Sequence, residues 1–141
     1  MSGPPLVFLD AKILFSAALG GPAFQLLLDL ARDGTVPLTT SNACMIEAAT
    51  NLERKRPDRR EALTPILAAL DVEPDAEADE HLDWAQGLVH PDDAHVLAAA
   101  RRRGADVLLT GDTTHFGPLM ERDDLGLTVR TPRAFLLEGP R

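Results

Sequence analysis

The stretch Val107-Leu108-Leu109-Thr110-Gly111-Asp112-Thr113-Thr114-His115-Phe116 joins an apolar run to a carboxylate and a short polar turn. Three consecutive apolar residues headed by a β-branched valine predict a buried strand. Thr110-Gly111 allows the backbone to turn out of the sheet, which leaves Asp112 at the carboxyl end of that strand. Because ligands of open α/β sheets bind outside the carboxyl ends of the strands, this turn predicts a binding site.

A similar arrangement lies near the other end of the chain, where the apolar run 6–9 ends in Asp10. Hydrophobic periodicity and turn residues organise the rest of the chain. The expected strands are 6–10, 36–40, a brief one at 72–74, one leading from 107 into Asp112, and 127–130. The expected helices are 11–18, 22–33, 42–56, 59–70, 76–88 and 94–103, with a turn or short helix through 120 and a last amphipathic turn at 132–137.

Strands that alternate with helices predict βαβ units with right-handed crossovers and a mostly parallel sheet. A length of 141 residues suits one domain that buries roughly two-thirds of its unfolded surface. No low-complexity segment or linker divides the chain. We therefore expect a single α/β domain over residues 1–141.

The composition favours a cytoplasmic protein. Apolar residues make up 45% of the chain, and no window approaches the roughly 18 consecutive apolar residues of a membrane span. The first residues lack the basic segment of a secretion signal. The lone Cys44 rules out an internal disulfide, fits a reducing compartment, and is expected to be a small buried hydrophobe.

The net charge of −8 argues against a protein whose whole surface binds nucleic acid, but it does not exclude a nuclease. Part of the acidic excess can belong to metal-binding carboxylates. The basic residues are clustered at Arg54, Lys55, Arg56, Arg59 and Arg60, and again at 101–103. Each cluster is either a solvated helix end favoured by the helix dipole or a surface that attracts a nucleic acid strand.

Asp10 and Asp112 are the strongest candidates for chemistry, because each ends a strand expected to be central. Either residue alone can simply cap the helix that follows. Together at one sheet edge they favour a shared ligand. Two carboxylates about 4 Å apart repel by roughly 4 kcal/mol at an effective dielectric near 20, so a cation or a raised pKa must relieve them.

Two further acidic positions and one histidine extend this set. Glu47 interrupts an otherwise apolar helical stretch that should pack on the sheet. Asp92 and Asp93 both lie where the helix 94–103 begins; Asp92, beside a proline, is expected to be the N-cap, which leaves Asp93 to point at the site. His115 is expected either to contact a phosphate or protonate a leaving group, or to be exposed in its turn.

Several segments together resemble the PIN-domain ribonucleases, in particular the VapC-like toxins of bacterial and archaeal toxin–antitoxin pairs. The segments, in the family's order, are 8–17, 41–47, 93–100, 109–112 with His115-Phe116, and 131–136. The resemblance implies a three-layer α/β/α fold in which a mostly parallel sheet is flanked by helices. It also implies that Asp10, Glu47, Asp93 and Asp112 meet around Mg²⁺ or Mn²⁺, for which oxygen ligands are suited.

For function, the resemblance implies a metal-dependent endoribonuclease that hydrolyses RNA phosphodiester bonds through a metal-activated water. Its expected partners are RNA and a protein antitoxin, and because such toxins are often dimers, a homodimer is a further expectation. Substrate contacts are expected from His115, Lys12, Arg54 and Lys55, the last two by electrostatic attraction of the strand.

Lys12 departs from the family's pattern, in which a small polar residue commonly follows two positions after the first aspartate. Its ammonium is expected to pair with Asp10 or Asp112, to bind the scissile phosphate, or to point to solvent. The alternative function is therefore a PIN-fold binding module with impaired catalysis. A third interpretation, an aspartyl phosphatase with Asp10 as nucleophile, requires a second aspartate at the position that Lys12 occupies.

Overall fold

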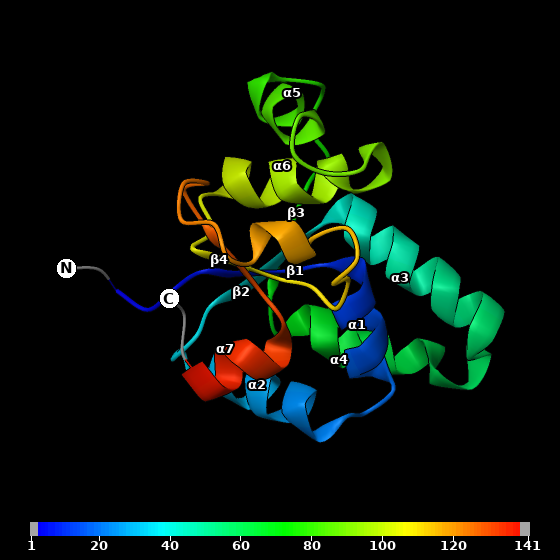
Figure 1. Ribbon diagram of the computed structural model, residues 1–141. Helices are drawn as coiled ribbons and strands as arrows, with labels where there is room; N and C mark the ends of the chain where they lie inside the picture. The colour runs from blue at the N-terminus through cyan, green and yellow to red at the C-terminus, as the bar shows by residue number, and fades with distance from the viewer. Residues whose placement is uncertain (1–2, 139–141) are drawn as a thin grey trace.

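The computed structural model describes residues 3–138, which form a five-stranded, fully parallel sheet between layers of helices (Figure 1). The strands are β1 (Val7–Leu9), β2 (Leu38–Ser41), β3 (Asp71–Glu73), β4 (Val107–Leu109) and β5 (Thr128–Arg130), in the order β3-β2-β1-β4-β5. β1 and β4 are neighbours near the centre, with Val7 opposite Val107 and Leu9 opposite Leu109. The residues that follow these two strands therefore leave the sheet side by side.

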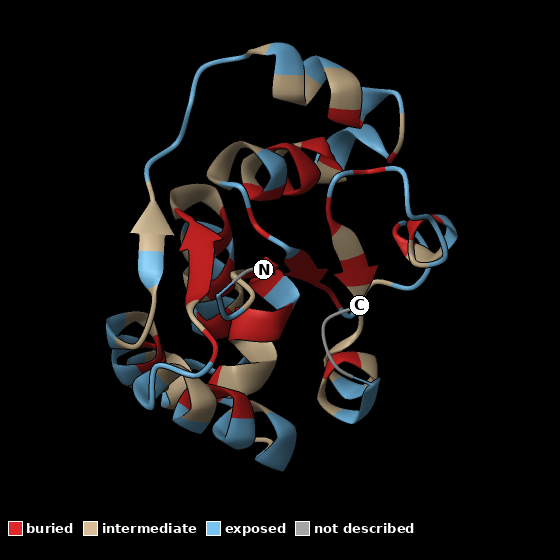
Figure 2. Ribbon diagram, turned by 90° about the vertical axis from the view of Figure 1, so that its left-hand side faces the viewer, coloured by how far each residue is buried: buried red, intermediate tan, exposed pale blue. Residues whose placement is uncertain are grey.

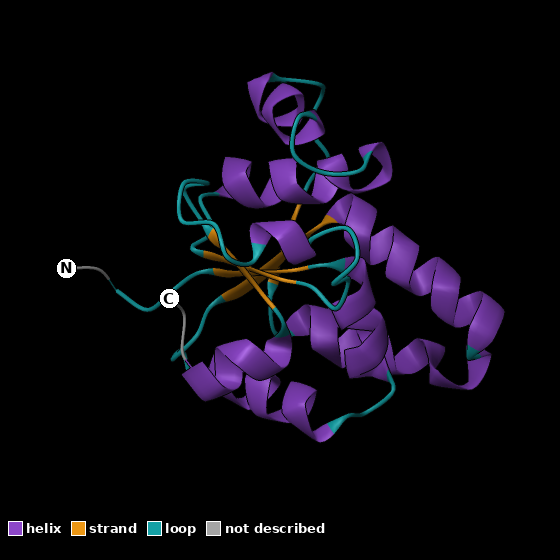
Figure 3. Cartoon of the chain, in the orientation of Figure 1, coloured by secondary structure: helices purple, strands orange, loops and turns teal. Residues whose placement is uncertain are grey.

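Helices cover both faces of the sheet (Figure 3). They are α1 (Ala11–Ala18), α2 (Pro22–Arg32), α3 (Asn42–Lys55), α4 (Leu63–Ala68), α5 (Glu80–Gln86), α6 (Ala94–Arg103) and α7 (Pro132–Glu138), with 3₁₀ turns η1 (Pro57–Ala62), η2 (Pro91–Asp93) and η3 (Gly117–Leu119). α6 lies on one face with α5 packed on its outer side, while α1, α2, α4 and α7 lie on the other (Figure 1). The expected three-layer α/β/α fold is confirmed.

The central strands are apolar along their whole length because helices cover both sides of them (Figure 2). All three residues of β1 and all three of β4 are buried, as the apolar runs in the sequence predicted. Phe8 and Leu108, paired across the two strands, have no exposed surface. The polar residues that follow these strands are therefore held by a rigid, desolvated core.

Several element ends differ by one residue from those expected from the sequence, and three differences are larger or change the element. β2 begins at Leu38, since Pro37 has no N–H to donate to a neighbouring strand. The helix expected at 59–70 is divided into η1 and α4, because the ring of Pro65 would clash with the Glu61 carbonyl of a continuous α-helix. The helix expected at 76–88 spans only Glu80–Gln86.

No single helix within residues 3–138 is long and apolar enough to cross a membrane. α1 and α2 reach that length and hydropathy only when taken together, and they are bent by 104° at the break between them.

Candidate metal centre

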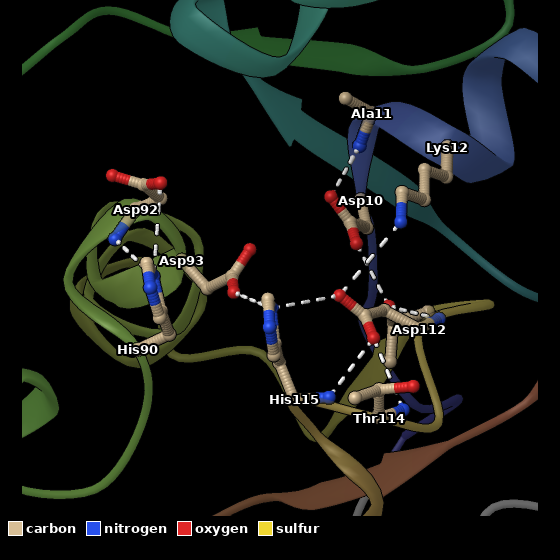
Figure 4. A network of polar contacts seen from close by, with 10 residues as sticks. Asp10, Ala11, Lys12, His90, Asp92, Asp93, Asp112, Thr114 and His115 are labelled. Carbon is tan, nitrogen blue, oxygen red and sulfur yellow. Dashed lines mark hydrogen bonds and ion pairs between the residues drawn. The ribbon is translucent and has the colours of Figure 1, made fainter.

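Three of the expected acidic residues approach one another at the carboxyl edge of the sheet (Figure 4). Asp10 follows β1 directly and Asp112 lies three residues beyond the end of β4, so the pairing of these two strands brings them together. Asp93 reaches the same edge from the start of α6. The site is thus assembled from two central strand ends and one helix that covers the sheet.

Asp10 is buried, with 6% of its surface exposed, and both of its carboxylate oxygens accept hydrogen bonds. Oδ1 accepts from the Ala11 N–H at 2.6 Å, which makes Asp10 the N-cap of α1, and Oδ2 accepts from Thr110 Oγ1 at 2.8 Å. Burial raises the pKa of Asp10, and the charges of Glu47 and Asp93 raise it further, against the two hydrogen bonds. Asp10 therefore both caps a helix and lies within the field of the other carboxylates.

Asp112 is held in place by its own turn. Its Oδ1 accepts from the N–H groups of Thr114 at 3.1 Å and His115 at 2.9 Å, and its N–H donates to Thr110 Oγ1 at 3.1 Å. Partial burial favours the neutral form, but these N–H groups and the nearby charges of Lys12 and His115 outweigh it and lower the pKa of Asp112. The side chain is therefore a carboxylate at neutral pH with its Oδ2 directed into the site.

Thr110 connects the two carboxylates, a role that the sequence did not indicate. Its hydroxyl donates to Asp10 and accepts from the backbone of Asp112, although it is completely buried. Thr110 appeared in the sequence only as part of a turn. The sequence contains one indication of this role: Thr110 directly follows a buried strand, where its hydroxyl must find buried hydrogen-bond partners.

Asp93 contributes a carboxylate oxygen that lacks a hydrogen bond. Its Oδ2 is shielded from solvent and no donor reaches it with hydrogen-bond geometry, although His115 Nδ1 lies 2.6 Å away in an ion pair. A tight group of three potential metal-ligand atoms forms here, all within 4.8 Å of one another: one carboxylate oxygen each from Asp93 and Asp112, and one ring nitrogen of His115. An unsatisfied buried oxygen beside a second carboxylate fits the preference of a divalent cation for oxygen ligands.

The expected assignment of Asp92 as the N-cap is wrong, and Asp93 occupies that position instead. A 3₁₀ turn precedes α6, and in it the backbone N–H of Asp92 donates to His90 Nδ1 at 3.1 Å. The Asp92 side chain is 88% exposed and caps nothing, while the Asp93 side chain forms no capping hydrogen bond. The Asp93 carboxylate is consequently available to the site.

Glu47 lies in α3 and is exposed. It forms no hydrogen bond or ion pair within residues 3–138, but its charge contributes to the raised pKa of Asp10. The structure thus places Glu47 near the site without bringing it into the tight group formed by Asp93 and Asp112.

Lys12 faces the site from the first turn of α1. Its Nζ lies 3.8 Å from Asp112 Oδ2, and 63% of the side chain is exposed (Figure 4). Of the orientations expected from the sequence, the structure shows the one toward Asp112. An ion pair this exposed is weak. A cation can therefore displace the Lys12 ammonium from Asp112, and a phosphate can attract it, with little loss of free energy.

The two basic clusters differ in how far acidic residues neutralise them. Arg102 is paired with Asp79 at 2.7 Å and Arg103 with Glu73 at 2.9 Å, so the second cluster is largely occupied in holding α6 to its neighbours. Arg54 and Lys55 lie exposed in the last turn of α3, which leads away from the site (Figure 1). Any contact of theirs with RNA would be made at a distance from the carboxylates.

Cys44, at the first turn of α3, is completely buried as expected. Burial raises the pKa of its thiol to about 12. Because the thiolate is the reactive form, Cys44 is excluded as a nucleophile at neutral pH.

The sequence profile of the PIN domain matches residues 6–114. No curated protein matches the sequence.

Among solved structures, VapBC2 from Rickettsia felis, bound to a DNA fragment from its promoter, is 14% identical with a TM-score of 0.66 over 89% of this chain and 98% of that chain. A toxin–antitoxin complex from Klebsiella pneumoniae is 18% identical with a TM-score of 0.65 over 89% and 97%. VapC20 from Mycobacterium tuberculosis, a toxin that cleaves the sarcin–ricin loop, is 18% identical with a TM-score of 0.55 over 77% and 91%. At such identities these three structures establish a shared fold.

Proposed function

This chain belongs to the PIN-domain family, and from that premise we propose that it is a metal-dependent endoribonuclease and the toxin of a toxin–antitoxin pair. PIN domains are typically metal-dependent nucleases. One observation carries the proposal for this chain: Asp93 and Asp112 converge at the carboxyl edge of the sheet, and Asp93 keeps a buried oxygen without a hydrogen bond. Such an arrangement is costly for the protein unless a cation completes it.

We assign Asp10, Glu47, Asp93 and Asp112 as the residues that would hold Mg²⁺ or Mn²⁺. The donor set is rich in carboxylate oxygens, which suits these ions. When bound, the ion would supply charge neutralisation at the phosphate and lower the pKa of a water molecule. Each Asp10 oxygen accepts one hydrogen bond, from Ala11 and from Thr110, and these two bonds fix the orientation of the carboxylate while leaving each oxygen a second lone pair.

The protein's own residues would position the substrate. The exposed ammonium of Lys12 lies beside the carboxylates and can donate to a phosphate oxygen that approaches them. His115 lies against the same carboxylates, within reach of a substrate bound there. Arg54 and Lys55 would add long-range attraction for the RNA strand, in a chain whose net charge of −8 otherwise repels it.

A protein antitoxin is the proposed partner. It is supported by the similar structures from Rickettsia felis and Klebsiella pneumoniae, of which the first is of a VapBC protein bound to DNA and the second is of a toxin–antitoxin complex. A homodimer is also proposed, because toxins of this family are often dimers.

The experiment that tests the nuclease compares Asp112→Asn with Asp92→Asn in cleavage of a labelled RNA in the presence of Mn²⁺. Asp112→Asn is expected to cleave at least about 100-fold more slowly, because loss of a ligand should exceed the 10–100-fold effect of losing a residue that only supports one. Asp92→Asn is the matched control and should cleave at the parent rate, since its side chain is exposed and caps nothing. Parent-level cleavage by Asp112→Asn would refute the proposal.

A second candidate function, a PIN-fold binding module without catalysis, is favoured by the contact between Lys12 and Asp112. In that case the ammonium takes the place of the cation. The parent protein would then gain no thermal stability from millimolar Mg²⁺ or Mn²⁺, and Lys12→Asn would restore the gain, because a ligand that binds only the native state stabilises it. Stabilisation of the parent protein by these ions would exclude this candidate.

The sequence disfavours the aspartyl phosphatase. Such an enzyme requires a second aspartate two positions after Asp10, and Lys12 occupies that position.

A further inference from the structure

We propose that His115 is a third ligand of the metal at Asp93 and Asp112, and that His90 holds the His115 ring in the ligating orientation. This inference rests on the proposed metal-dependent function and adds to it a nitrogen ligand and a preference among metals.

The spacing of the three atoms supports ligation. His115 Nδ1 lies 2.6 Å from Asp93 Oδ2 and 3.2 Å from Asp112 Oδ2. Adjacent ligands of an octahedral ion with bonds of 2.0–2.1 Å are about 2.9 Å apart, from the right angle between them. The two distances lie on either side of this separation, so small shifts of the side chains would bring the nitrogen to it, on the side of the ring that faces both carboxylates (Figure 4).

The other acidic residues lie outside this group. Asp10 is not among the residues whose ligand atoms lie within 4.8 Å of one another, although its two oxygens are held by hydrogen bonds from Ala11 and Thr110. Glu47 is exposed and does not belong to the group of atoms within 4.8 Å of one another. The tightest set of ligand atoms in residues 3–138 is therefore two carboxylates and an imidazole, not carboxylates alone.

His90 fixes the orientation of the His115 ring. The two rings are stacked with centroids 4.9 Å apart and planes 8° from parallel. The Nδ1 of His90 already accepts a hydrogen bond from the Asp92 N–H, so this nitrogen is occupied within η2. His90 is accordingly a positioning residue: its ring restricts rotation of His115 and keeps Nδ1 toward Asp93 and Asp112.

A nitrogen ligand alters which metals the site prefers. Imidazole suits first-row transition metals, whose affinity rises from Mn²⁺ to Co²⁺, whereas Mg²⁺ prefers oxygen ligands and retains its waters. The site should therefore bind Co²⁺ more tightly than Mg²⁺, and the preference should depend on His115.

The test measures binding of Co²⁺ and Mg²⁺ to the intact protein by calorimetry, together with the visible absorption of the Co²⁺ form. In His115→Ala and His115→Gln, Co²⁺ affinity is expected to fall at least about 100-fold, more than the 10–100-fold loss for a residue that only supports a ligand, with a change in absorption as nitrogen is lost. Mg²⁺ affinity should change much less. Thermal unfolding without metal identifies any variant that fails to fold; the glutamine variant preserves side-chain bulk and polarity if alanine does not fold. His81→Ala, in α5, controls for adventitious binding by histidine.

His90 is tested with two substitutions. His90→Asn keeps a side-chain acceptor for the Asp92 N–H but lacks the ring, and it should weaken Co²⁺ binding. His90→Ala, which loses both the acceptor and the ring, should weaken binding at least as much. Parent-like Co²⁺ affinity in folded His90→Asn would overturn the positioning role.

The result that overturns the ligand assignment is parent-like Co²⁺ affinity and absorption in His115→Ala. If Asp93→Asn and Asp112→Asn lose metal binding in the same experiment, only this inference fails and the proposed function stands. If the aspartate variants also bind like the parent protein, the proposed metal site fails with it.

Discussion

Two acidic regions of this molecule use the same residue type in opposite ways. Between α5 and α6, Asp79 accepts two hydrogen bonds of 2.7 Å from the Arg102 guanidinium and two more from the backbone of His81 and Leu82. At the carboxyl edge of the sheet, Asp93 and Asp112 share one imidazole, and Asp112 also lies beside one exposed ammonium. The first region is satisfied within the protein and the second is not.

The two regions differ in the groups that neutralise their carboxylates. A guanidinium is always protonated and matches a carboxylate with two parallel hydrogen bonds, so the Asp79–Arg102 pair is a fixed structural link. An imidazole and an exposed lysine leave carboxylate oxygens accessible to another cation. The number of acidic residues is thus a poor guide to a site in this chain, and the nature of their partners is a good one.

The largest expected effect separates the two regions by activity. Asp93→Asn should slow RNA cleavage at least about 100-fold, for the reason that it removes a proposed metal ligand. Asp79→Asn should cleave at the parent rate, measured well below its unfolding temperature, because the hydrogen-bond partners of Asp79 within residues 3–138 are the backbone of α5 and Arg102. Equal loss of cleavage in the two folded variants would contradict the proposal that only the sheet-edge carboxylates take part in catalysis.

A second prediction concerns Asp10, which is satisfied like Asp79 but by neutral donors. Thr110→Val removes the hydroxyl that donates to the buried Asp10 Oδ2 and should lower the free energy of unfolding by about 1.5–3 kcal/mol, the range for hydrogen bonds to charged groups. Thr40→Val, which removes a buried hydrogen bond to the Leu9 carbonyl, is the control and should cost about 1 kcal/mol. Both values come from urea denaturation in the presence of EDTA. A smaller loss for Thr110→Val than for Thr40→Val would mean that Asp10 does not depend on this hydroxyl.

The smallest expected effect is a pH dependence of stability at Asp79. The Arg102 guanidinium holds the pKa of Asp79 well below its ordinary value. A carboxyl whose pKa is lower in the folded state stabilises the protein above its unfolded pKa of about 3.9, and this contribution is lost as pH falls below that value. The parent protein should therefore unfold at a higher temperature than Asp79→Asn at pH 7, and the difference should shrink below about pH 4.

Asparagine can keep the N-cap hydrogen bonds of α5 through its Oδ1 but cannot accept from Arg102 Nε, so this comparison removes the ion pair, both its charge and one of its hydrogen bonds. Asp83→Asn, an exposed substitution in the same helix, should show no comparable difference. A gap between parent and Asp79→Asn that stays constant from pH 7 to pH 2.5 would contradict the role of the ion pair.

Local features of the sequence were sufficient for the fold class and for many of the elements. Apolar runs of three residues predicted β1 and β4, Ser41 caps α3 through a hydrogen bond to the Cys44 N–H, and Gly104 ends α6 in the left-handed conformation. The resemblance to PIN domains, carried by short motifs in order, is confirmed by the match over residues 6–114. These features depend on neighbours within a few positions, which the sequence displays directly.

Predictions failed where two local signals competed. Asp92 and Asp93 both suited an N-cap, and the 3₁₀ turn that selects Asp93 depends on His90 accepting a backbone hydrogen bond. The helix expected at 76–88 includes Asp79, but the observed helix begins at Glu80 with Asp79 as its N-cap. In each case the backbone conformation depended on a partner that the spacing of residues does not reveal.

The sequence by itself thus determined the alternation of strands and helices, the burial of the central strands and the residue types of an acidic site. Only the tertiary structure decided that Thr110 bonds to Asp10, 100 positions away, that Lys12 faces Asp112, and that Arg102 neutralises Asp79. The physical reason is the distance along the chain over which each kind of interaction acts. Propensity, capping and hydrophobic period act within one or two turns of chain, whereas the partner of a charged group is set by strand order and helix packing, which join residues far apart in the sequence.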